Sequence, residues 1–282
     1  MRFVVPLSKL VLLASLYLAQ GLPFGFFTHS LPVLLRKQGV SLAWIGSTFL
    51  LASPWALKFL WAPYVDRYGN ARFGWRRSLI VPLQALSVLL LAALSQYDAK
   101  LGLGVLFAAV FCANLFAATQ DIATDALAVE VLPESERGLG NGVQVAGFRL
   151  GMIVGGGLIL VLFDYLGHAS AMLAMAGMLL VLSVPIALYR EPIRSPALIS
   201  ASARGGSSFA LLWARVRSPR FQGWLWLLVL CRGADFGTAM LRPLLVDGGR
   251  SLTDIGWLTG TVGAMAGLCG ALFGGIQLRR MR

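Results

Sequence analysis

The sequence predicts an all-α integral membrane protein. Of its 282 residues, 57% are hydrophobic and only 13% are charged, whereas a soluble domain carries about 25% charged residues. The mean hydropathy is +0.75. Apolar runs of about 20 residues, the length that crosses a bilayer as a helix, recur along the chain. Because lipid cannot satisfy exposed backbone groups, we expect each run to be helical.

Eight apolar runs are candidate membrane spans. The first could be mistaken for a signal peptide, but it continues past the roughly 7–15 apolar residues that such a peptide has, so we expect a retained helix. Three cysteines lie inside spans, too widely scattered for a disulfide framework or a metal site. The spans lie near residues 10–34, 41–64, 78–96, 102–128, 141–165, 169–189, 222–246 and 252–277.

The net charge of +12 reflects membrane topology rather than binding to nucleic acid. When the connections between spans are assigned alternately to two sides, most of the 24 Lys and Arg share a side with both termini. Such an excess marks the cytosolic side, so both termini are expected in the cytosol. The other side has Arg36, Lys37, Lys100 and Arg250, and the spans or their edges hold Lys58, Arg149, Arg232 and Arg242.

The span at 102–128 contains acidic residues that lipid tolerates poorly. Asp121 and Asp125 are one helical turn apart, and each would cost about 2.5–3.5 kcal/mol near the middle of a membrane. Asn114 shares their stripe, while Gln120 and Thr124 lie on the adjoining flank. Two explanations stay open. The acids form an ion-pair network between packed helices, or they line a transport pathway in which a desolvated carboxylate exchanges a proton.

Basic residues of other spans are candidate partners for these acids. Counted along their helices, Lys58 and Arg149 reach a depth similar to that of Asp121, and Lys58 is the preferred partner. The alternatives for Lys58 are structural pairing and a role in switching or substrate contact. On the seventh span, Arg232 and Asp235 stand three residues apart and can pair on one face. We expect both in a central cavity.

The first span carries helix-breaking residues near its middle. Pro23 removes the hydrogen bond to Ala19, and Gly21 loosens the same turn, so a kink that frees carbonyls near Ala19 is expected. Broken helices at the midplane are where transporters place binding sites, and a packing kink is the alternative. His29 is expected close to the outer surface, as an interfacial residue rather than a proton carrier.

The short loop after the second span carries an acid beside a turn glycine. A positive-inside excess explains its arginines but not the pattern of Asp66, Arg67 and Gly69. The pattern resembles the D-R-x-G loop of the major facilitator superfamily, in which the acidic residue clamps the inner gate to neighbouring helix ends. Candidate partners at the inner end of the fourth span are Glu130, Glu136 and Arg137.

A shift of 210 residues aligns the turn after the first span with the turn after the seventh. The matches are Leu34-Leu35, Gly39, Ser41-Leu42 and Ile45-Gly46 with Leu244-Leu245, Gly249, Ser251-Leu252 and Ile255-Gly256. Parallel repeats of this kind build some transporters. We therefore expect a six-helix half at 1–190, a cytosolic connector at 191–221 and a partial second half at 222–282. Because the four helices that complete the first half, from about residue 73 to 190, have no counterpart in the second, we expect a truncated reading frame or a fragment.

Glycines line the fifth and eighth spans at helical spacing, which lets helix backbones approach closely. In a facilitator fold these two spans meet between the halves. Static packing and sliding during transport are both compatible with the pattern. The glycines are Gly147, Gly151 and Gly155, and Gly256, Gly260, Gly263, Gly267, Gly270 and Gly274.

Four segments together resemble the AmpG-like muropeptide permeases of the major facilitator superfamily: Tyr17–Gly25, Lys58–Pro63 with Asp66-Arg67, Ala118–Ala126 with Glu130, and Glu136–Gln144. The resemblance implies a six-helix N-terminal bundle followed by the first two helices of a C-terminal bundle. It also implies proton-driven import of anhydromuropeptides, with their GlcNAc-anhydroMurNAc core, across the bacterial inner membrane for peptidoglycan recycling.

The family resemblance and the polar residues of the spans together define the expected site. The coupling candidates are Lys58, Asp121 and Asp125, and the gate candidates are Asp66, Arg67, Gly69, Glu130, Glu136 and Arg137. The substrate-pathway candidates are Tyr17, Gln20, Pro23, Asn114, Gln120, Thr124, Gln144, Arg149, Arg232 and Asp235.

Other functions fit less well. Two acids one turn apart on one helix are poorly arranged to flank a substrate, which disfavours an intramembrane aspartyl hydrolase. The sequence has no G-x-x-x-x-G-K-[ST] loop for an ATP-driven pump. An acetyl-CoA or other small-molecule transporter and an inactive relic or scaffold remain alternatives. We expect a monomeric, non-enzymatic carrier that uses a proton gradient and no cofactor.

Overall fold

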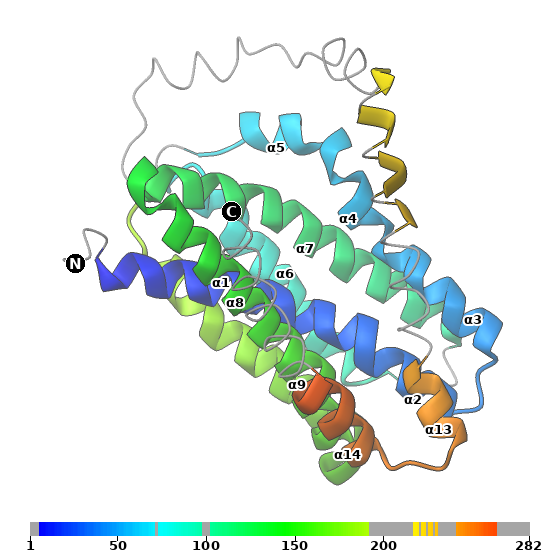
Figure 1. Ribbon diagram of the computed structural model, residues 1–282. Helices are drawn as coiled ribbons and strands as arrows, with labels where there is room; N and C mark the ends of the chain where they lie inside the picture. Colours follow the sequence, from blue (N-terminus) through cyan, green and yellow to red (C-terminus); the bar gives the residue numbers. More distant parts are fainter. Residues whose placement is uncertain are drawn as a thin grey trace, which may run out of the picture.

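The computed structural model describes residues 6–70, 73–97, 102–191, 217–219, 221–223, 225–227, 229–230 and 241–263. Within these ranges the regular structure is helical, and the β-structure is limited to an isolated bridge between Asn70 and Gly74. Long helices pack side by side in a bundle, as Figure 1 shows. The all-α fold expected from composition and hydropathy is confirmed.

Four helical stretches are long and apolar enough to cross a membrane: Leu7–Lys37, Arg77–Leu94, Leu103–Val131 and Arg137–Leu188. The last has 52 residues and contains a reversal at Gly167, where φ is 78° and ψ is 178°. It therefore supplies both the fifth and the sixth predicted spans. The chain is a multi-pass membrane protein, and the predicted boundaries of these spans agree with the helices to within a few residues.

The elements follow the predicted order. The first span comprises α1 (Leu7–Gly25), the π-helix η1 (Phe26–Ser30) and α2 (Leu31–Lys37). The third is α6 (Arg77–Leu94) and the fourth is α7 (Leu103–Val131). The stretch that supplies the fifth and sixth follows the short 3-10 helix η5 (Glu134–Glu136). It consists of α8 (Arg137–Ile153), the π-helix η6 (Val154–Leu158) and α9 (Ile159–Leu188). The described parts of the last two spans are α13 (Leu241–Asp247), and α14 (Leu252–Ile255) with the π-helix η7 (Gly256–Val262).

The second span is broken into short pieces, where the sequence predicts one apolar run. Prolines at positions 54 and 63 begin new helical segments, because a proline cannot donate the backbone hydrogen bond of a helix interior. Tight 3-10 turns separate these segments. In order, the pieces are α3 (Leu42–Ser47), η2 (Thr48–Ala52), α4 (Ser53–Leu57), η3 (Lys58–Leu60) and α5 (Ala62–Arg67). They lie along α7 in Figure 1.

The two turns related by the 210-residue shift have the same backbone structure. Gly39 has a φ of 82° and Gly249 a φ of 74°. In the first turn the Gly39 amide donates to Arg36 and the Val40 amide to Leu35. Gly249 and Arg250 make the corresponding bonds to Val246 and Leu245. This double bond pattern with a left-handed glycine is the Schellman motif, so the repeat extends to hydrogen bonding.

The first span remains α-helical through Pro23. α1 continues to Gly25, and the departure from α-geometry is the π-helical turn η1 that follows. Gly21 serves packing instead, because a Cβ at this position would collide with the Phe148 backbone of α8. The helices α1 and α8 are thus in backbone contact along the bundle (Figure 1).

The apolar core is divided by a layer of buried polar residues. One cluster includes Leu22, Leu91 and Ala113, and a second includes Leu16, Ile80 and Ala123. Gln84 of α6 and Gln120 of α7 lie between the residues of these two clusters along their helices, and Gln20 of α1 lies between Ala19 and Leu22 of the first cluster. All three amides are buried. The middle of the bundle therefore carries a polar layer.

Candidate functional site

A cavity of about 830 Å³ opens between helices from both ends of the described chain. Its walls come from α1, η1, α4, η3, α7, α8, α13 and η7. Polar residues on these walls include Tyr17, Lys58, Asp121, Gln144, Arg149 and Arg242. The cavity falls within the range of about 300–1,000 Å³ that is usual for small-molecule sites. It is the centre of the candidate site.

An ion pair between Lys58 and Asp121 lies on the cavity wall. The Asp121 side chain is 10% exposed and that of Lys58 is 33% exposed. The ammonium group also lies 5.8 Å from the centre of the Trp55 ring, a cation–π distance. The break in the second span makes this possible, because Lys58 begins the 3-10 helix η3. The structure thus contains the pairing that we inferred from depth alone.

The second acid of α7 has different partners. Asp125 accepts hydrogen bonds from the Tyr17 hydroxyl at 2.9 Å and from Gln144 Nε2 at 3.2 Å. These donors come from α1 and α8. Two carboxylates one turn apart therefore have separate environments, a cation for Asp121 and neutral donors for Asp125.

Aromatic residues of the second span fix its register against α7. Trp55 Nε1 donates to Asn114 Oδ1 at 3.0 Å, and Trp61 Nε1 donates to Thr119 Oγ1 at 3.2 Å. The sequence analysis placed Asn114 on the pathway but overlooked Trp55, which lines the cavity. A tryptophan in an apolar run gives little signal until its indole partner is known.

Several predicted pathway residues lie in the packed interior. Gln20, Pro23, Gln120 and Thr124 are buried and are not among the residues that line the cavity. Within the described part of the chain, both amide atoms of Gln20, Nε2 of Gln120 and the Thr124 hydroxyl have no hydrogen-bond partner. Arg149, in contrast, lies on the cavity wall. Arg232 and Asp235 fall outside the described residues.

His29, which we expected to be an interfacial residue close to the outer surface, belongs to the cavity wall. Its Nδ1 contacts Arg242 Nη1 of α13. Arg242 Nε also donates to Thr259 Oγ1 at 2.8 Å. Depth along one helix suggested a surface position, but the bundle places α13 and η7 beside η1 and covers the imidazole. Arg242 and Thr259 were not predicted as site residues.

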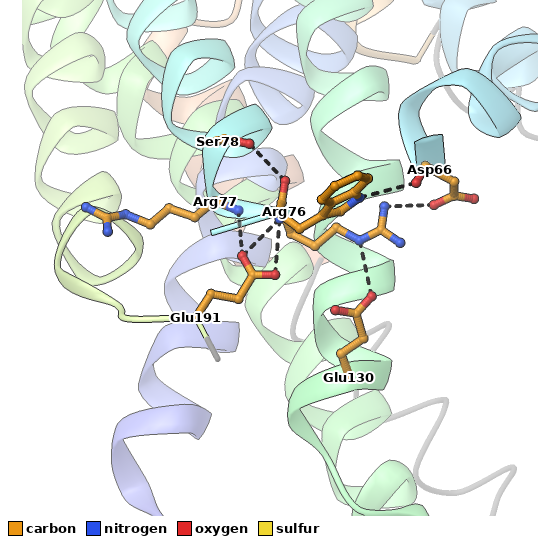
Figure 2. A network of polar contacts seen from close by, with 7 residues as sticks. Asp66, Arg76, Arg77, Ser78, Glu130 and Glu191 are labelled. Atoms are coloured by element: carbon orange, nitrogen blue, oxygen red, sulfur yellow. Dashed lines mark hydrogen bonds and ion pairs between the residues drawn. The ribbon is translucent and has the colours of Figure 1, made fainter. Parts of the chain in front are cut away.

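The loop after the second span forms a network around Arg76, shown in Figure 2. The Arg76 side chain is 6% exposed; its Nη1 donates to Asp66 at 2.8 Å and its Nε donates to Glu130 at 3.2 Å. Glu191 accepts from the backbone amides of Arg76 and Arg77. The predicted residues Asp66 and Glu130 are thus joined through an arginine that sequence reasoning assigned only to topology.

The other predicted gate residues lie at the edge of this network. A Cβ at Gly69 would lie 2.6 Å from the Trp75 ring, so close packing against the indole requires glycine there. Arg67 and Arg137 are exposed, and Glu136 is partly buried. Among the described residues, neither Glu136 nor Arg137 forms an ion pair with the loop.

The described residues form a helical bundle with buried polar residues and a cavity between its helices. The family model of the Major Facilitator Superfamily matches residues 13–282. The chain belongs to this superfamily of membrane transporters. Its family is thus one of transporters rather than of enzymes.

Particular relatives narrow the comparison. The chain is 31% identical to the "Anhydromuropeptide permease" of Escherichia coli (strain K12) over 99% of its own length and 57% of the permease. It is 28% identical to an "Uncharacterized protein" of Haemophilus influenzae over 97% of its own length and 65% of that protein. It is also 25% identical to "Putative transporter AmpG 4" of Rickettsia felis over 94% of its own length and 66% of that protein. The chain thus spans between about half and two thirds of the length of these relatives.

Proposed function

We propose that the chain takes part in proton-driven import of anhydromuropeptides across the bacterial inner membrane. The observation that carries this proposal is the cavity of about 830 Å³ with the Lys58–Asp121 ion pair on its wall. A disaccharide needs a cavity of this order and polar groups that replace its hydration. The relatedness to a protein named as a permease for anhydromuropeptides supports the substrate class.

In this proposal the Asp66 end of the bundle and both termini face the cytosol. The excess of arginine around Asp66 supports this orientation. The turns at Gly39 and Gly249 then face the periplasm. We refer to them as the glycine-turn end.

Proton coupling would use the two acids of α7. Substrate that enters the cavity contacts Lys58 and weakens its hold on Asp121, which favours protonation of that carboxyl. Asp125 is tied to Tyr17 of α1 and to Gln144 of α8, so its protonation changes the hydrogen bonds between three helices. If the carboxylate is neutral in one conformation of the carrier and charged in the other, proton binding favours the first conformation over the second.

The test uses the chain in nanodiscs and isothermal titration with GlcNAc-anhydroMurNAc. We expect saturable binding accompanied by proton exchange, seen as a binding enthalpy that varies with the ionisation enthalpy of the buffer. Asp125→Asn should keep the binding and remove at least part of the proton exchange. Acetyl-CoA is titrated in parallel, because saturable binding of acetyl-CoA alone would overturn the muropeptide assignment.

Uptake into proteoliposomes adds a second measurement. An imposed pH gradient, acidic outside, should drive accumulation of the labelled disaccharide, and Asp125→Asn should abolish it while leaving membrane insertion intact. Undiminished accumulation by Asp125→Asn would exclude this residue as the coupling group. The same comparison with Asp121→Asn separates the two acids.

A further inference from the structure

Three π-helical segments meet beside the cavity. η6 lies between η1 and η7, and its glycines permit the contact. A Cβ at Gly156 would lie 2.9 Å from the His29 side chain, and a Cβ at Gly256 would lie 3.0 Å from the Gly157 carbonyl oxygen. π-helical turns are frequent at functional sites. His29 of η1 and Thr259 of η7 thus lie close together on the cavity wall.

Arg242 is held between these two segments. Its Nη1 contacts the imidazole Nδ1 of His29, and its Nε donates to Thr259 Oγ1 at 2.8 Å. The Thr259 hydroxyl can accept this bond because its own hydrogen is donated to the Ile255 carbonyl at 2.7 Å. An imidazole nitrogen that accepts from a guanidinium carries no proton, so His29 orients the arginine without neutralising it.

The charge of Arg242 has no carboxylate partner within the described part of the chain. Arg149 also lines the cavity and has no ion-pair partner among the described residues. Among the described residues that line the cavity the acid is Asp121, and Lys58 already pairs with it. The described part of the cavity wall therefore carries an excess of positive charge. A charged group inside a membrane is expensive unless it has a partner, and such a residue marks a ligand pathway.

We propose that Arg242, oriented by His29 and Thr259, binds a carboxylate of the transported substrate, with Arg149 as a second cationic contact. A guanidinium offers five N–H donors in a planar fork that matches a carboxylate; the contacts of Nε with Thr259 Oγ1, Nη1 with His29 and Nη2 with the Thr259 carbonyl oxygen at 3.5 Å use three of them and leave one hydrogen on each Nη. The site lies under the glycine-turn end. Arg242 precedes Asp247 at the end of α13 by five residues, which is about 7.5 Å along a helix.

The inference rests on the proposed function for the identity of the ligand. GlcNAc-anhydroMurNAc ends in a free lactyl carboxylate, and the forms with a stem peptide carry peptide carboxylates instead. The site therefore predicts recognition of an acidic group, which can come from either source. A neutral sugar would gain nothing from Arg242.

The experiment compares acid and ester ligands on variants of the chain in nanodiscs. GlcNAc-anhydroMurNAc, its methyl ester and the disaccharide with a stem tripeptide are titrated into the unmodified chain, Arg242→Gln, Arg242→Lys and Arg250→Gln. Arg250 is an exposed residue of the adjacent turn, so its variant is a matched control for loss of charge. Thermal unfolding checks that each variant folds.

Arg242→Gln should weaken binding of the acid about 10–100-fold, the range for losing a charge-assisted bond, and binding of the ester less than threefold. Arg242→Lys should lose less, and Arg250→Gln should change neither ligand. The experiment also identifies the source of the carboxylate, because it shows whether Arg242→Gln lowers the affinity for the disaccharide or for its tripeptide form. Equal losses for acid and ester would overturn the proposal and make Arg242 a structural residue.

Failure of the proposed function gives a different result. If no muropeptide binds the unmodified chain, the substrate assignment falls, and acetyl-CoA becomes the anionic probe. If Arg242→Gln then abolishes binding of acetyl-CoA while Arg250→Gln does not, Arg242 would still be supported as an anion-binding residue. Binding of acetyl-CoA that both variants retain would overturn the site as well.

Discussion

Arg36 and Asp247 form a two-point ion pair between the ends of the first and seventh spans. Arg36 Nε donates to Asp247 Oδ1 at 2.6 Å, and Arg36 Nη2 donates to Oδ2 at 3.0 Å. Beside this pair, Asp164 accepts from Lys37 at 3.5 Å and from the Thr253 hydroxyl at 2.9 Å. Residues of the two repeated turns and of α9 are thus tied together at the glycine-turn end.

Asp247→Asn should loosen this end. The substitution replaces a charged, bidentate pair with at most one neutral hydrogen bond. We expect a cysteine placed at Met152 on the cavity wall to react several-fold faster with a membrane-impermeant maleimide added at the glycine-turn end. The three native cysteines are first replaced by serine.

Asp254→Asn is the matched control, because Asp254 is an exposed acid on the same turn with no ion-pair partner among the described residues. The exchanged pair Arg36→Asp with Asp247→Arg should restore slow labelling. If Asp247→Asn labels at the rate of the unmodified chain, the pair does not hold this end closed.

The same pair predicts a flat pH response near neutrality. The hydrogen bond from Arg36 holds the pKa of Asp247 below its usual value, which is about 3.9. A lowered pKa contributes stability that is fully present above the usual value and is lost as pH falls through the lowered one. Distances between spin labels at Gln38 and Gly248 should therefore stay constant from about pH 8 to pH 5 and broaden only below about pH 4. Broadening that begins near pH 6 would show that another group controls this end.

The Lys58–Asp121 pair should show strong coupling in stability. Lys58→Met leaves the more buried partner, Asp121, without its cation, and we expect a loss of about 1–3 kcal/mol in the free energy of unfolding. Asp121→Asn should cost less, because the Lys58 ammonium group is partly exposed to the cavity. Replacing both with apolar residues, Lys58→Met with Asp121→Leu, should recover most of the loss.

Unfolding in mixed micelles with increasing dodecyl sulfate measures these three variants. Additive losses in the double variant would contradict a coupled pair. The double variant also separates two roles, because a stable protein that no longer takes up substrate assigns the pair to transport rather than to packing.

Gly151→Ala should separate α1 from α8. A Cβ at Gly151 would lie 2.7 Å from the Leu22 amide nitrogen and 2.8 Å from the Gly21 Cα, and backbone atoms cannot move aside as side chains do. Such overpacking typically costs about 1–3 kcal/mol. Gly177→Ala is the control, since a Cβ there meets nothing within 4 Å. It should be neutral or stabilising by up to about 1 kcal/mol, the difference in helix propensity. Equal stability of the two variants would show that the contact is looser than described.

Arg76→Gln should disrupt the network at the Asp66 end. Without the guanidinium, Asp66 and Glu130 keep their negative charges but lose the cation between them (Figure 2). We expect faster proteolysis of the loop around Asn70 and a lower thermal midpoint. Arg76→Lys should recover only part of the effect, because an ammonium group lacks the separated Nε and Nη1 donors that reach the two acids. Arg67→Gln, at an exposed site, should leave both properties unchanged. A loop in Arg76→Gln that resists protease as well as in Arg67→Gln would rule out this role.

Hydropathy and spacing predicted the spans with described boundaries well, because these features report directly on burial in lipid. The internal match around Gly39 and Gly249 also proved reliable, since a left-handed glycine and its Schellman bonds impose a local sequence signature. Lys58 and Asp121 could be paired from depth alone. In each case the prediction uses a property that can be read within one helix or one turn: its hydropathy, its glycine pattern, or the depth of a residue along its own helix.

The contacts that were missed depend on which helices meet. Arg76 looked like one of many topological arginines until the fold brought Asp66 and Glu130 to it. His29 looked interfacial until η7 and α13 covered it. The π-helical turns gave no clear signal in the sequence, because they arise where backbones of different helices come into close contact. The predicted division into two halves remains a prediction.

The glycine faces of α1 and α8 have a mechanical consequence. The main chain of α1 touches that of α8 at Gly21 and Gly151 and that of η6 at Gly155, so these helices cannot slide past each other without a collision and should move as one rigid unit. Tyr17 of α1 donates to Asp125, and His29 lies further along the same helical stretch, in η1. A movement of this rigid unit that follows a change at Asp125 would therefore also move His29. Protonation of Asp125 would then be transmitted to His29, twelve residues and about three helical turns from Tyr17, without any conformational change within these helices.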